Sequence, residues 1–450
     1  MLWDNKSMKK KKELWKLSTF QIIIYSFAVA ILVGALLLCL PFATRDGRGA
    51  NFFDALFTST SAVCVTGLVV KDTWQHWSLF GRIIIISLIQ IGGLGIITVT
   101  LLIFILAGKK ISLDQRLVMK DAISADKVGG ILRLTSFIFR FTFFAEITGA
   151  LLLSPVFIGR YGVVDGIGYS LFHSVSAFCN AGFDLEGEYG AFSSLCPYHD
   201  NPLINIVIMC LIVSGGLGFL TWKDILDNRW RIRKYSVQSK GIMMMTVILI
   251  FVPALYFYFT EFNSLEPADR FFASLFQSVT ARTAGFNTQD LASLTDNGKI
   301  VMMVLMLIGG APGSTAGGMK VTTILVLLAS SLSTFRDQEQ TVLLRRTIKN
   351  DSIKKASSLF MMYIFLFLSA AMVISHLEKI DIMTCMFETA SAIGTVGLSL
   401  GITSTLSLAS RMILILLMYF GRVGGLTIIF AAVTYNPVHG KYPAEDISVG

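Results

Sequence analysis

The chain alternates between long apolar stretches and short polar connections, and this pattern is the first guide to its fold. About 20 consecutive apolar residues are enough for one helix to cross the hydrocarbon core of a bilayer. Stretches near this length predict eight membrane-spanning helices, the sixth of them interrupted: Phe20–Leu40, Ile83–Leu106, Leu134–Ile158, Leu203–Leu220, Ile242–Phe259, Ile300–Leu332, Leu359–Ser375 and Met412–Val433. The first stretch is too long for a signal peptide and ends at Pro41, so we expect it to be retained.

Shorter segments lie between these spans. As helices of about 11–14 residues they would measure roughly 17–21 Å, too short to span a membrane but long enough to enter halfway and return. They are Ala50–Ala62, Gly166–Ala177, Ala268–Ala281 and Ile382–Ala392. Acidic residues stand near their starts, at Asp54, Asp165, Asp269 and Asp381, and ordinary preference for acids at helix N-termini explains them. If the N-termini face outside, four partially negative C-terminal ends converge near the bilayer centre and favour a cation there.

Each short segment runs into a related phrase that ends in glycine and a large apolar residue. The phrases are SAVCVTGL at Ser61–Leu68, SAFCNAGF at Ser176–Phe183, TARTAGF at Thr280–Phe286 and SAIGTVGL at Ser391–Leu398. Non-helical backbone survives at membrane depth only where protein buries it or where it lines water. The fold class predicted is an all-α polytopic membrane protein, with four parallel helix–pore loop–helix repeats around a central pseudo-fourfold pore.

The repeats also divide the chain. We expect a cytoplasmic basic tail over residues 1–17, repeats over 18–110, 111–222, 223–335 and 336–434, and a cytoplasmic C-terminal tail over 435–450.

The phrases have the composition of a carbonyl-lined selectivity filter. Extended backbone supplies the row of oxygens that a dehydrated monovalent cation needs, and glycine aims carbonyls inward without side-chain bulk. The filter residues predicted are Val65, Thr66, Gly67, Asn180, Ala181, Gly182, Thr283, Ala284, Gly285, Thr395, Val396 and Gly397. The absence of a carboxylate among them disfavours a divalent-cation filter. A single such phrase is also typical of small-residue helix packing, but four copies in the same setting favour the filter.

The third phrase departs from the others, because it is one residue shorter and carries Arg282. An arginine at the entrance would repel cations. We therefore expect Arg282 to turn into the surrounding protein and to pair with an acid.

The spans that follow the phrases carry a second glycine pattern. The pairs Gly92-Gly93 and Gly215-Gly216 are interpreted mainly as sites of close helix packing. The third copy, GGAPGSTAGG, cannot form a stable helix in lipid, and it predicts a flexible gate below the filter. The gate residues predicted are Gly309, Gly310, Ala311, Pro312, Gly313, Ser314, Thr315, Ala316, Gly317, Gly318 and Arg422. A phosphate-binding loop is excluded, because the following lysine is misplaced and no strand precedes the loop.

Charged residues within the spans are costly and usually face a cavity or a partner. Arg422 is either an electrostatic barrier beside the loop or a member of a structural ion pair, and the sequence leaves both open. Glu146 is expected to form a structural pair with Arg140 on the same helix. Lys320 receives no assignment.

Composition agrees with a membrane protein. The chain of 450 residues is 54% hydrophobic and only 15% charged, with a mean hydropathy of +0.68. Its net charge of +9 is concentrated at the ends of spans, which by the positive-inside rule places these segments and both termini in the cytoplasm. Membrane topology therefore explains the basic balance, and nucleic-acid binding is not expected. The basic segments are 1–17, 107–133, 222–240, 333–355 and 434–450.

No enzyme is expected, since neither the six cysteines nor the five histidines show ligand or catalytic spacing. The expected location is the cell membrane, and no cofactor is expected to bind this chain.

Taken together, the four phrases, the GGAPGSTAGGMKVTT stretch and the FGRVGGLT stretch resemble the Trk/Ktr/HKT superfamily of potassium transporters over about residues 15–450. Eight spans rather than ten, and a short tail with Lys441-Tyr442-Pro443 and a final Gly450, are similar to a bacterial Ktr membrane subunit. Sodium-favouring plant members carry serine at the first filter position. Gly67 stands there, so the resemblance implies potassium.

The resemblance also implies partners and regulation. Members of this kind form homodimers with one pore per protomer, embedded in membrane lipid. They sit on a cytosolic ring of nucleotide-binding RCK-type subunits, and uptake is often sodium-stimulated. The stretch Gly309–Gly318 and Arg422 match the gate region. Candidate docking surfaces are the basic positions Arg229, Arg231, Arg233, Lys234, Arg345 and Arg346, which topology explains equally well.

The function predicted is passive potassium uptake gated by a cytosolic partner, with K⁺ as the transported ion and Na⁺ as a possible activator. One alternative is a sodium-conducting or sodium-coupled relative. A further alternative is the channel-like subunit of an energised pump, which would need an ATPase partner.

Overall fold

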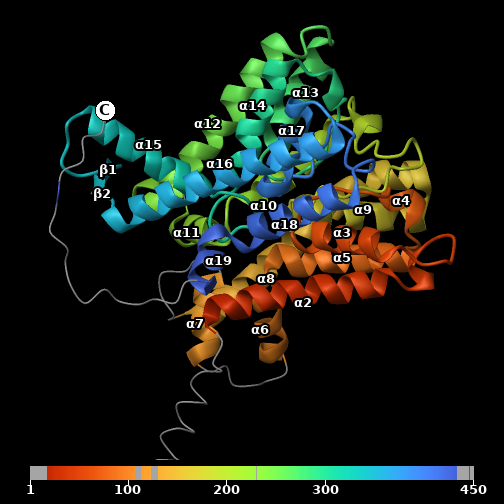
Figure 1. Ribbon diagram of the computed structural model, residues 1–450, viewed down its shortest axis with the longest axis horizontal. Helices are drawn as coiled ribbons and strands as arrows, with labels where there is room; N and C mark the ends of the chain where they lie inside the picture. The colour runs from red at the N-terminus through yellow and green to blue at the C-terminus, as the bar shows by residue number, and fades with distance from the viewer. Residues whose placement is uncertain (1–17, 107–112, 123–129, 230, 433–444, 446–450) are drawn as a thin grey trace, which may run out of the picture.

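The computed structural model describes residues 18–106, 113–122, 130–229, 231–432 and 445 (Figure 1). The predicted cytoplasmic tails, residues 1–17 and 435–450, lie outside the described residues except for Glu445, and so does the Lys441-Tyr442-Pro443 motif. The described part is helical apart from short connections and one hairpin of two-residue strands, β1 (Val342–Leu343) and β2 (Arg346–Thr347).

Four long helices each pack against the short helix that follows them in sequence. The long helices are α2 (Thr19–Leu38), α8 (Ile131–Tyr161), α12 (Val237–Thr260) and α16 (Asn350–Glu378). The short ones are α3 (Phe52–Val63), α9 (Val163–Phe178), α13 (Pro267–Thr280) and α17 (Ile382–Gly394). In Figure 1 the red-to-yellow and the green-to-blue halves of the chain lie beside each other in one bundle.

Local capping explains where several of these helices begin. The Ser18 side chain and Gln21 form a reciprocal capping box at the start of α2. Asn51 caps α3 and Asp381 caps α17 through backbone N–H groups of the first turn. The short helices start and end within a few residues of the predicted segments, since these polar caps and the glycine phrases mark both ends in the sequence.

The spans after the phrases are not straight, which corrects the predicted continuous helices Ile83–Leu106, Leu203–Leu220 and Met412–Val433. Helix α5 (Leu79–Leu94) turns by 95° into α6 (Ile96–Leu106), α10 (Pro202–Gly216) turns by 95° into α11 (Phe219–Asn228), and α18 (Leu408–Val423) turns by 92° into α19 (Gly425–Ala432). Glycines stand at the three breaks with φ between +83° and +90°, a backbone conformation that other residues adopt at a cost. They are Gly95, Gly218 and Gly424.

The third repeat replaces the bend with a loop. Helix α14 (Asp296–Leu307) ends before the glycine-rich stretch, and α15 (Val321–Phe335) begins after it, as the predicted interruption requires. The remaining helices are α4 (Thr73–His76) and α7 (Leu113–Ala122), with short 3₁₀ turns η1 (Pro41–Ala43), η2 (Cys196–Tyr198), η3 (Ile232–Lys234) and η4 (Leu291–Ser293). The predicted repeat boundary at residue 222 falls inside α11.

The outward faces of the long helices are apolar. Phe144 and Leu151 of α8 and Phe365 of α16 are 68–70% exposed, which is unusual for a protein in water but normal in lipid. Among the described residues, four helices are long and apolar enough to cross a membrane, or up to seven if each bent pair is one span. The sequence pattern predicted eight, with the interrupted α14–α15 pair counted as one of them.

Glycines bring the second helices into backbone contact with the ends of the short helices. A β-carbon on Gly92, Gly215 or Gly421 would lie 1.9–2.2 Å from the carbonyl oxygen of Val63, Phe178 or Ile393, respectively. Only glycine permits this approach. The packing role predicted for Gly92 and Gly215 is therefore present in the structure, in addition to the bends three residues later.

We expect Gly215→Ala to destabilise the protein and Gly216→Ala to be nearly neutral. A methyl group on Gly215 would sit 1.9 Å from the Phe178 carbonyl oxygen, whereas the nearest atom to one on Gly216 is 3.5 Å away. Overpacking of this kind costs about 1–3 kcal/mol, and both variants gain the same helix propensity. The measurement is the thermal unfolding midpoint of the purified protein in detergent. Equal midpoints for the two variants would contradict this packing.

Candidate functional site

The four phrases meet backbone to backbone and close a ring. A β-carbon on Gly67 would lie 2.4 Å from the carbonyl oxygen of Ala181 in the next repeat. The same relation holds from Gly182 to Ala284 at 2.6 Å, from Gly285 to Val396 at 2.3 Å and from Gly397 back to Thr66 at 2.2 Å. Each glycine thus faces the carbonyl that precedes the next glycine, and the fourth repeat returns to the first. We call Gly67, Gly182, Gly285 and Gly397 the glycine ring.

The backbone of each phrase is wound in the same unusual way. Two positions before each glycine stands a residue with positive φ: Val65 (57°), Asn180 (59°), Thr283 (72°) and Thr395 (50°). The glycines themselves have φ between 68° and 97°. Left-handed backbone at residues other than glycine costs about 1–3 kcal/mol and persists only where the surroundings enforce it. Its recurrence at four equivalent positions indicates that the four phrases share one backbone geometry there.

Hydroxyl groups at the ends of the short helices hold this geometry. The Oγ of Ser61 accepts a hydrogen bond from the Gly67 N–H, and the Oγ of Ser391 accepts one from the Gly397 N–H, both at 3.0 Å. In the other two repeats the hydroxyl donates instead, from Ser176 to the Phe183 carbonyl (2.7 Å) and from Thr280 to the Phe286 carbonyl (2.5 Å). Sequence reasoning noted these residues as the first letters of the phrases but did not assign them this role.

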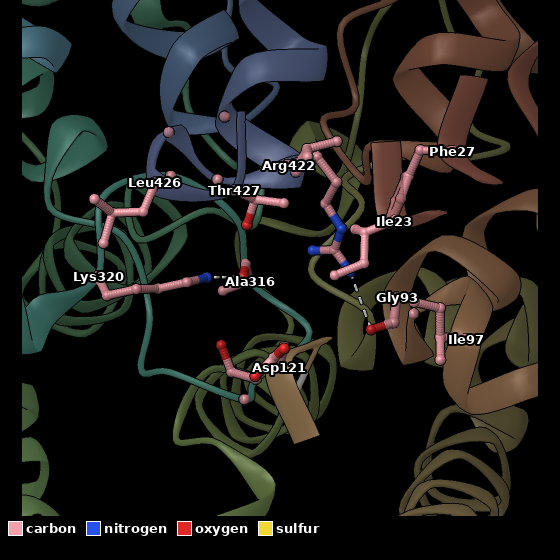
Figure 2. Close-up of a pocket in the computed structure, with 18 of the residues that line it drawn as sticks. Ile23, Phe27, Gly93, Ile97, Asp121, Ala316, Lys320, Arg422, Leu426 and Thr427 are labelled. Atoms are coloured by element: carbon pink, nitrogen blue, oxygen red, sulfur yellow. Dashed lines mark hydrogen bonds between the residues drawn. The ribbon is translucent and has the colours of Figure 1, made fainter. Parts of the chain in front are cut away.

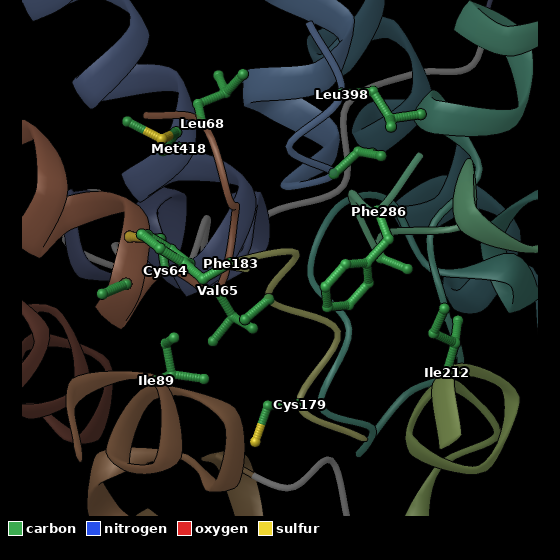
Figure 3. Close-up of a cluster of buried hydrophobic side chains, with 14 of the residues drawn as sticks. Cys64, Val65, Leu68, Ile89, Cys179, Phe183, Ile212, Phe286, Leu398 and Met418 are labelled. Atoms are coloured by element: carbon green, nitrogen blue, oxygen red, sulfur yellow. The ribbon is translucent and has the colours of Figure 1, made fainter. Parts of the chain in front are cut away.

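The large apolar residue after each glycine anchors the ring from outside. Figure 3 shows Leu68, Phe183, Phe286 and Leu398 among the buried side chains that surround the phrases. All four are at most 1% exposed. Because these side chains fill the protein around the phrases, the backbone of the ring is held in place by burial of apolar surface.

Two cavities lie on the two sides of the ring. The mouth cavity, of about 220 Å³, is lined by the glycine ring and by the residues that follow it. It includes the residue two positions after each glycine, and three of these four side chains carry oxygen: Val69, Asp184, Asn287 and Ser399. The sequence analysis found no carboxylate inside the phrases, and it missed that Asp184 stands at their edge.

The loop cavity, of about 250 Å³, is lined by parts of the glycine-rich loop, by α6 and by the α18–α19 bend. The loop itself lies against the fourth phrase, since a β-carbon on Gly317 would be 2.1 Å from the Thr395 Oγ1. It also bridges repeats two and four. The N–H of Ala311 donates to the Gly216 carbonyl at 2.9 Å, and the N–H of Gly318 donates to the Gly421 carbonyl at 3.1 Å.

Arg422 ties the loop to the first repeat (Figure 2). Its guanidinium donates to the carbonyl oxygens of Thr315, Gly92 and Gly93, the last at 3.1 Å. Among the described residues no acid lies within ion-pair distance of Arg422, so the ion-pair alternative is not supported. Lys320 donates within its own segment, to the Ala316 carbonyl at 2.7 Å, which gives this previously unassigned side chain a place in the loop.

Two predicted pairings are wrong. Arg282 is turned into the protein as expected and is 7% exposed, but its partner is the Thr246 hydroxyl at 3.5 Å, and no acid of the described chain pairs with it. Glu146 does not contact Arg140. It accepts a hydrogen bond from the Gln90 amide at 3.2 Å. Arg140 lies on another side of the helix, because residues six apart on a helix point in different directions.

The rest of the described chain offers no metal centre, since no group of three or more His, Cys, Asp or Glu side chains there could hold a metal ion. The six cysteines are free. The arrangement instead offers backbone oxygens. Helices α3, α9, α13 and α17 end where the phrases begin, so their partially negative C-termini point at the ring, and such a site stabilises a cation.

Comparison with known proteins shows which family the chain resembles. The sequence model of the TrkH family, described as "Cation transport protein", matches residues 4–439. "Potassium/sodium uptake protein NtpJ" of Enterococcus hirae is 40% identical and is covered over its whole length by 99% of this chain. "Ktr system potassium uptake protein B" of Bacillus subtilis is 36% identical over 96% of both chains.

A solved structure supports the fold. The crystal structure of the potassium transporter TrkH from Vibrio parahaemolyticus superposes with a TM-score of 0.74 at 20% identity, covering 94% of this chain and 86% of that one. With the apolar helices described above, this confirms that the protein is an all-α polytopic membrane protein.

We expect Ser391→Ala to destabilise the protein more than Thr389→Ala. The first change leaves the buried Gly397 N–H without its acceptor, at a cost of about 1–3 kcal/mol. The hydroxyl of Thr389 donates only within its own helix, to the carbonyls of Cys385 at 3.0 Å and Met386 at 3.2 Å. Thermal unfolding in detergent measures the difference. If Thr389→Ala lowers the unfolding midpoint as much as Ser391→Ala does, the hydrogen bond from the Gly397 N–H to Ser391 contributes no more to stability than an ordinary helix hydroxyl.

Proposed function

The chain belongs to the TrkH family of cation transport proteins, and on this basis we propose that it carries potassium ions into the cell through the glycine ring. Because the family transports cations, the prediction that the chain is not an enzyme is confirmed. The proposed location is the cell membrane with both termini in the cytoplasm, as the distribution of basic residues favours.

The observation that carries the proposal is the closed ring of glycine and carbonyl contacts. Four backbones approach at one level, and the residue of each phrase that meets the carbonyl of the next phrase is a glycine, which bears no side chain. Carbonyl oxygens at such a level replace the hydration shell of a monovalent cation. The mouth cavity and the loop cavity on either side provide aqueous access, and the Asp184 carboxylate at the mouth attracts cations.

Potassium is favoured as the substrate because all four ring positions are glycine and because the relatives are named for potassium uptake. The second candidate is sodium conduction or sodium coupling in the same fold. The name of the relative at 40% identity, a potassium/sodium uptake protein, supports keeping this candidate. Sodium as an activator of potassium uptake remains part of the proposal.

The glycine-rich loop and Arg422 are proposed as the gate. They occupy the space directly beneath the ring, and the three carbonyl contacts of Arg422 hold the loop there. A fixed positive charge at this level also repels cations. Movement of the loop and Arg422 together would then open the pathway.

Control by partners is proposed from the family resemblance. We propose a homodimer, surrounded by membrane lipid and seated on a cytosolic ring of nucleotide-binding RCK-type subunits. Exposed basic residues offer contact points for that ring, at Arg229, Arg231, Arg233 and Lys234 and at Arg345 and Arg346 in the β1–β2 hairpin. No cofactor is proposed for this chain itself, and nucleic acid is not a proposed partner.

Gly397→Ser is expected to lower potassium and rubidium uptake relative to sodium. Its β-carbon would lie 2.2 Å from the Thr66 carbonyl, at a residue with φ of +97°. Displacement of that oxygen costs selectivity, roughly tenfold if about 1.4 kcal/mol is lost. Liposome flux assays with the three cations measure the ratio.

Gly168→Ser on α9 is the matched control, since nothing lies within 4 Å of its would-be β-carbon. Equal sodium and potassium flux in the unmodified protein would favour the second candidate function, sodium transport. A Gly397→Ser variant with unchanged selectivity would refute the ring as the filter.

Arg422→Gln is expected to raise potassium flux through the purified protein several-fold, because the loop loses its contacts with the first repeat. Lys320→Met is the comparison, as Lys320 binds only its own loop and its loss should change flux less. The measurement for both variants is the rate of potassium uptake into liposomes at one potassium concentration. Unchanged or reduced flux in Arg422→Gln would exclude a gating role for this arginine.

A further inference from the structure

A second fourfold set of positions lies behind the glycine ring. The residue three positions before each anchoring hydroxyl residue (Ser61, Ser176, Thr280 and Ser391) stands on the buried face of a short helix, and all four side chains are 0% exposed. They are chemically unlike: Thr58 on α3, His173 on α9, Gln277 on α13 and Glu388 on α17. Because equivalent positions carry such different side chains, these side chains make different contacts in the four repeats.

Glu388 binds the segment that leaves the ring in the fourth repeat. One carboxyl oxygen accepts hydrogen bonds from the Ser399 hydroxyl and, at 3.3 Å, from the Leu400 N–H. The other accepts from the Thr403 hydroxyl at 3.0 Å. No cation of the described chain lies within ion-pair distance, so these three donors are what hold the buried carboxyl group.

The partners of Glu388 line the path of the ion. Ser399, Leu400 and Thr403 all border the mouth cavity. The Ser399 oxygen also accepts from the Gly401 N–H at 2.9 Å, and the Thr403 hydroxyl lies 3.0 Å from it. Glu388 therefore acts through Ser399 on the position of the backbone that follows Val396 and Gly397, without touching the pore itself.

The opposite repeat has a matching contact. The His173 Nε2 lies 3.4 Å from the N–H of Leu185, which is the third residue after Gly182, just as Leu400 is the third after Gly397. The other ring nitrogen, Nδ1, bonds the Tyr169 carbonyl at 2.8 Å and fixes the imidazole. In repeats two and four, a buried polar side chain thus links the short helix to the same backbone N–H.

The other two repeats lack this link. The Thr58 hydroxyl donates to the Asp54 carbonyl of its own helix at 2.9 Å, and the Gln277 side-chain amide donates to the Met302 sulfur at 3.4 Å. Since the order around the ring is one, two, three, four, the linked repeats face each other across the pore. The support of the filter is therefore twofold rather than fourfold.

We propose that Glu388 is a positioning residue that determines ion selectivity, by holding residues 398–403 so that the Val396 carbonyl and the Ser399 hydroxyl keep their place at the mouth of the pore. The inference rests on the proposed function, because selectivity presupposes transport through the ring. Loss of this support widens one wall of the filter and favours the wrong cation, whereas the rest of the pathway stays intact.

The test compares Glu388→Ala, Glu388→Gln and Thr58→Val in liposome flux assays with potassium and sodium. Loss of hydrogen bonds to a carboxylate is expected to lower the potassium-to-sodium ratio about tenfold in Glu388→Ala. Glutamine offers an acceptor to Ser399 and a donor to Thr403, so it should restore most of the ratio. Thr58→Val, at the equivalent position of repeat one, should leave it unchanged.

Assembly is checked by size-exclusion chromatography and thermal unfolding. If Glu388→Ala does not assemble, Ser399→Ala replaces it, because it removes the hydroxyl that Glu388 holds and should lower the ratio in the same direction. Assembled variants that keep the full ratio would overturn the inference. Absence of potassium selectivity in the unmodified protein would instead overturn the proposed function, so the two failures are distinguishable.

Discussion

The structure depends on one constraint: four stretches of backbone must approach one another closely at a single level. Gly67, Gly182, Gly285 and Gly397 each place an α-carbon where any side chain would strike the carbonyl of the next repeat. The glycines of α5, α10 and α18 bring the second helices equally close to the short helices. Close packing without side chains is therefore used twice, first to build the ring and then to enclose it.

Such a ring has to be held by its surroundings, because its backbone is not a low-energy one. The hydroxyl anchors fix the phrases to the helix ends, and the buried apolar residue after each glycine prevents rotation of the backbone. Glu388 and His173 add support from behind in two of the four repeats. Beneath the ring, the glycine-rich loop satisfies its own backbone groups with carbonyls of Gly215, Gly216 and Gly421, so it packs without secondary structure of its own.

Much of this could be predicted from the sequence, because repetition and hydrophobic length are visible there. The short helix α3, predicted as Ala50–Ala62, covers Phe52–Val63. The 92–95° bends could not be predicted, since an apolar run records length but not direction, and Gly95 resembles any packing glycine. The left-handed Val65 and Thr395 carry no sequence signal. The pairings expected for Glu146 and Arg282 failed because their partners, Gln90 and Thr246, come from other helices.

The differences between the four repeats around the glycine ring have a consequence for the evolution of the protein. When four identical subunits form a pore, every mutation alters all walls together and its effects are multiplied. Here one chain supplies all four sides of the ring, and the residues two positions after the glycines differ from one another: Val69, Asp184, Asn287 and Ser399. Under the proposed function, a single codon change alters one quarter of the ion pathway and leaves the other three repeats unchanged, so ion preference can evolve in small steps.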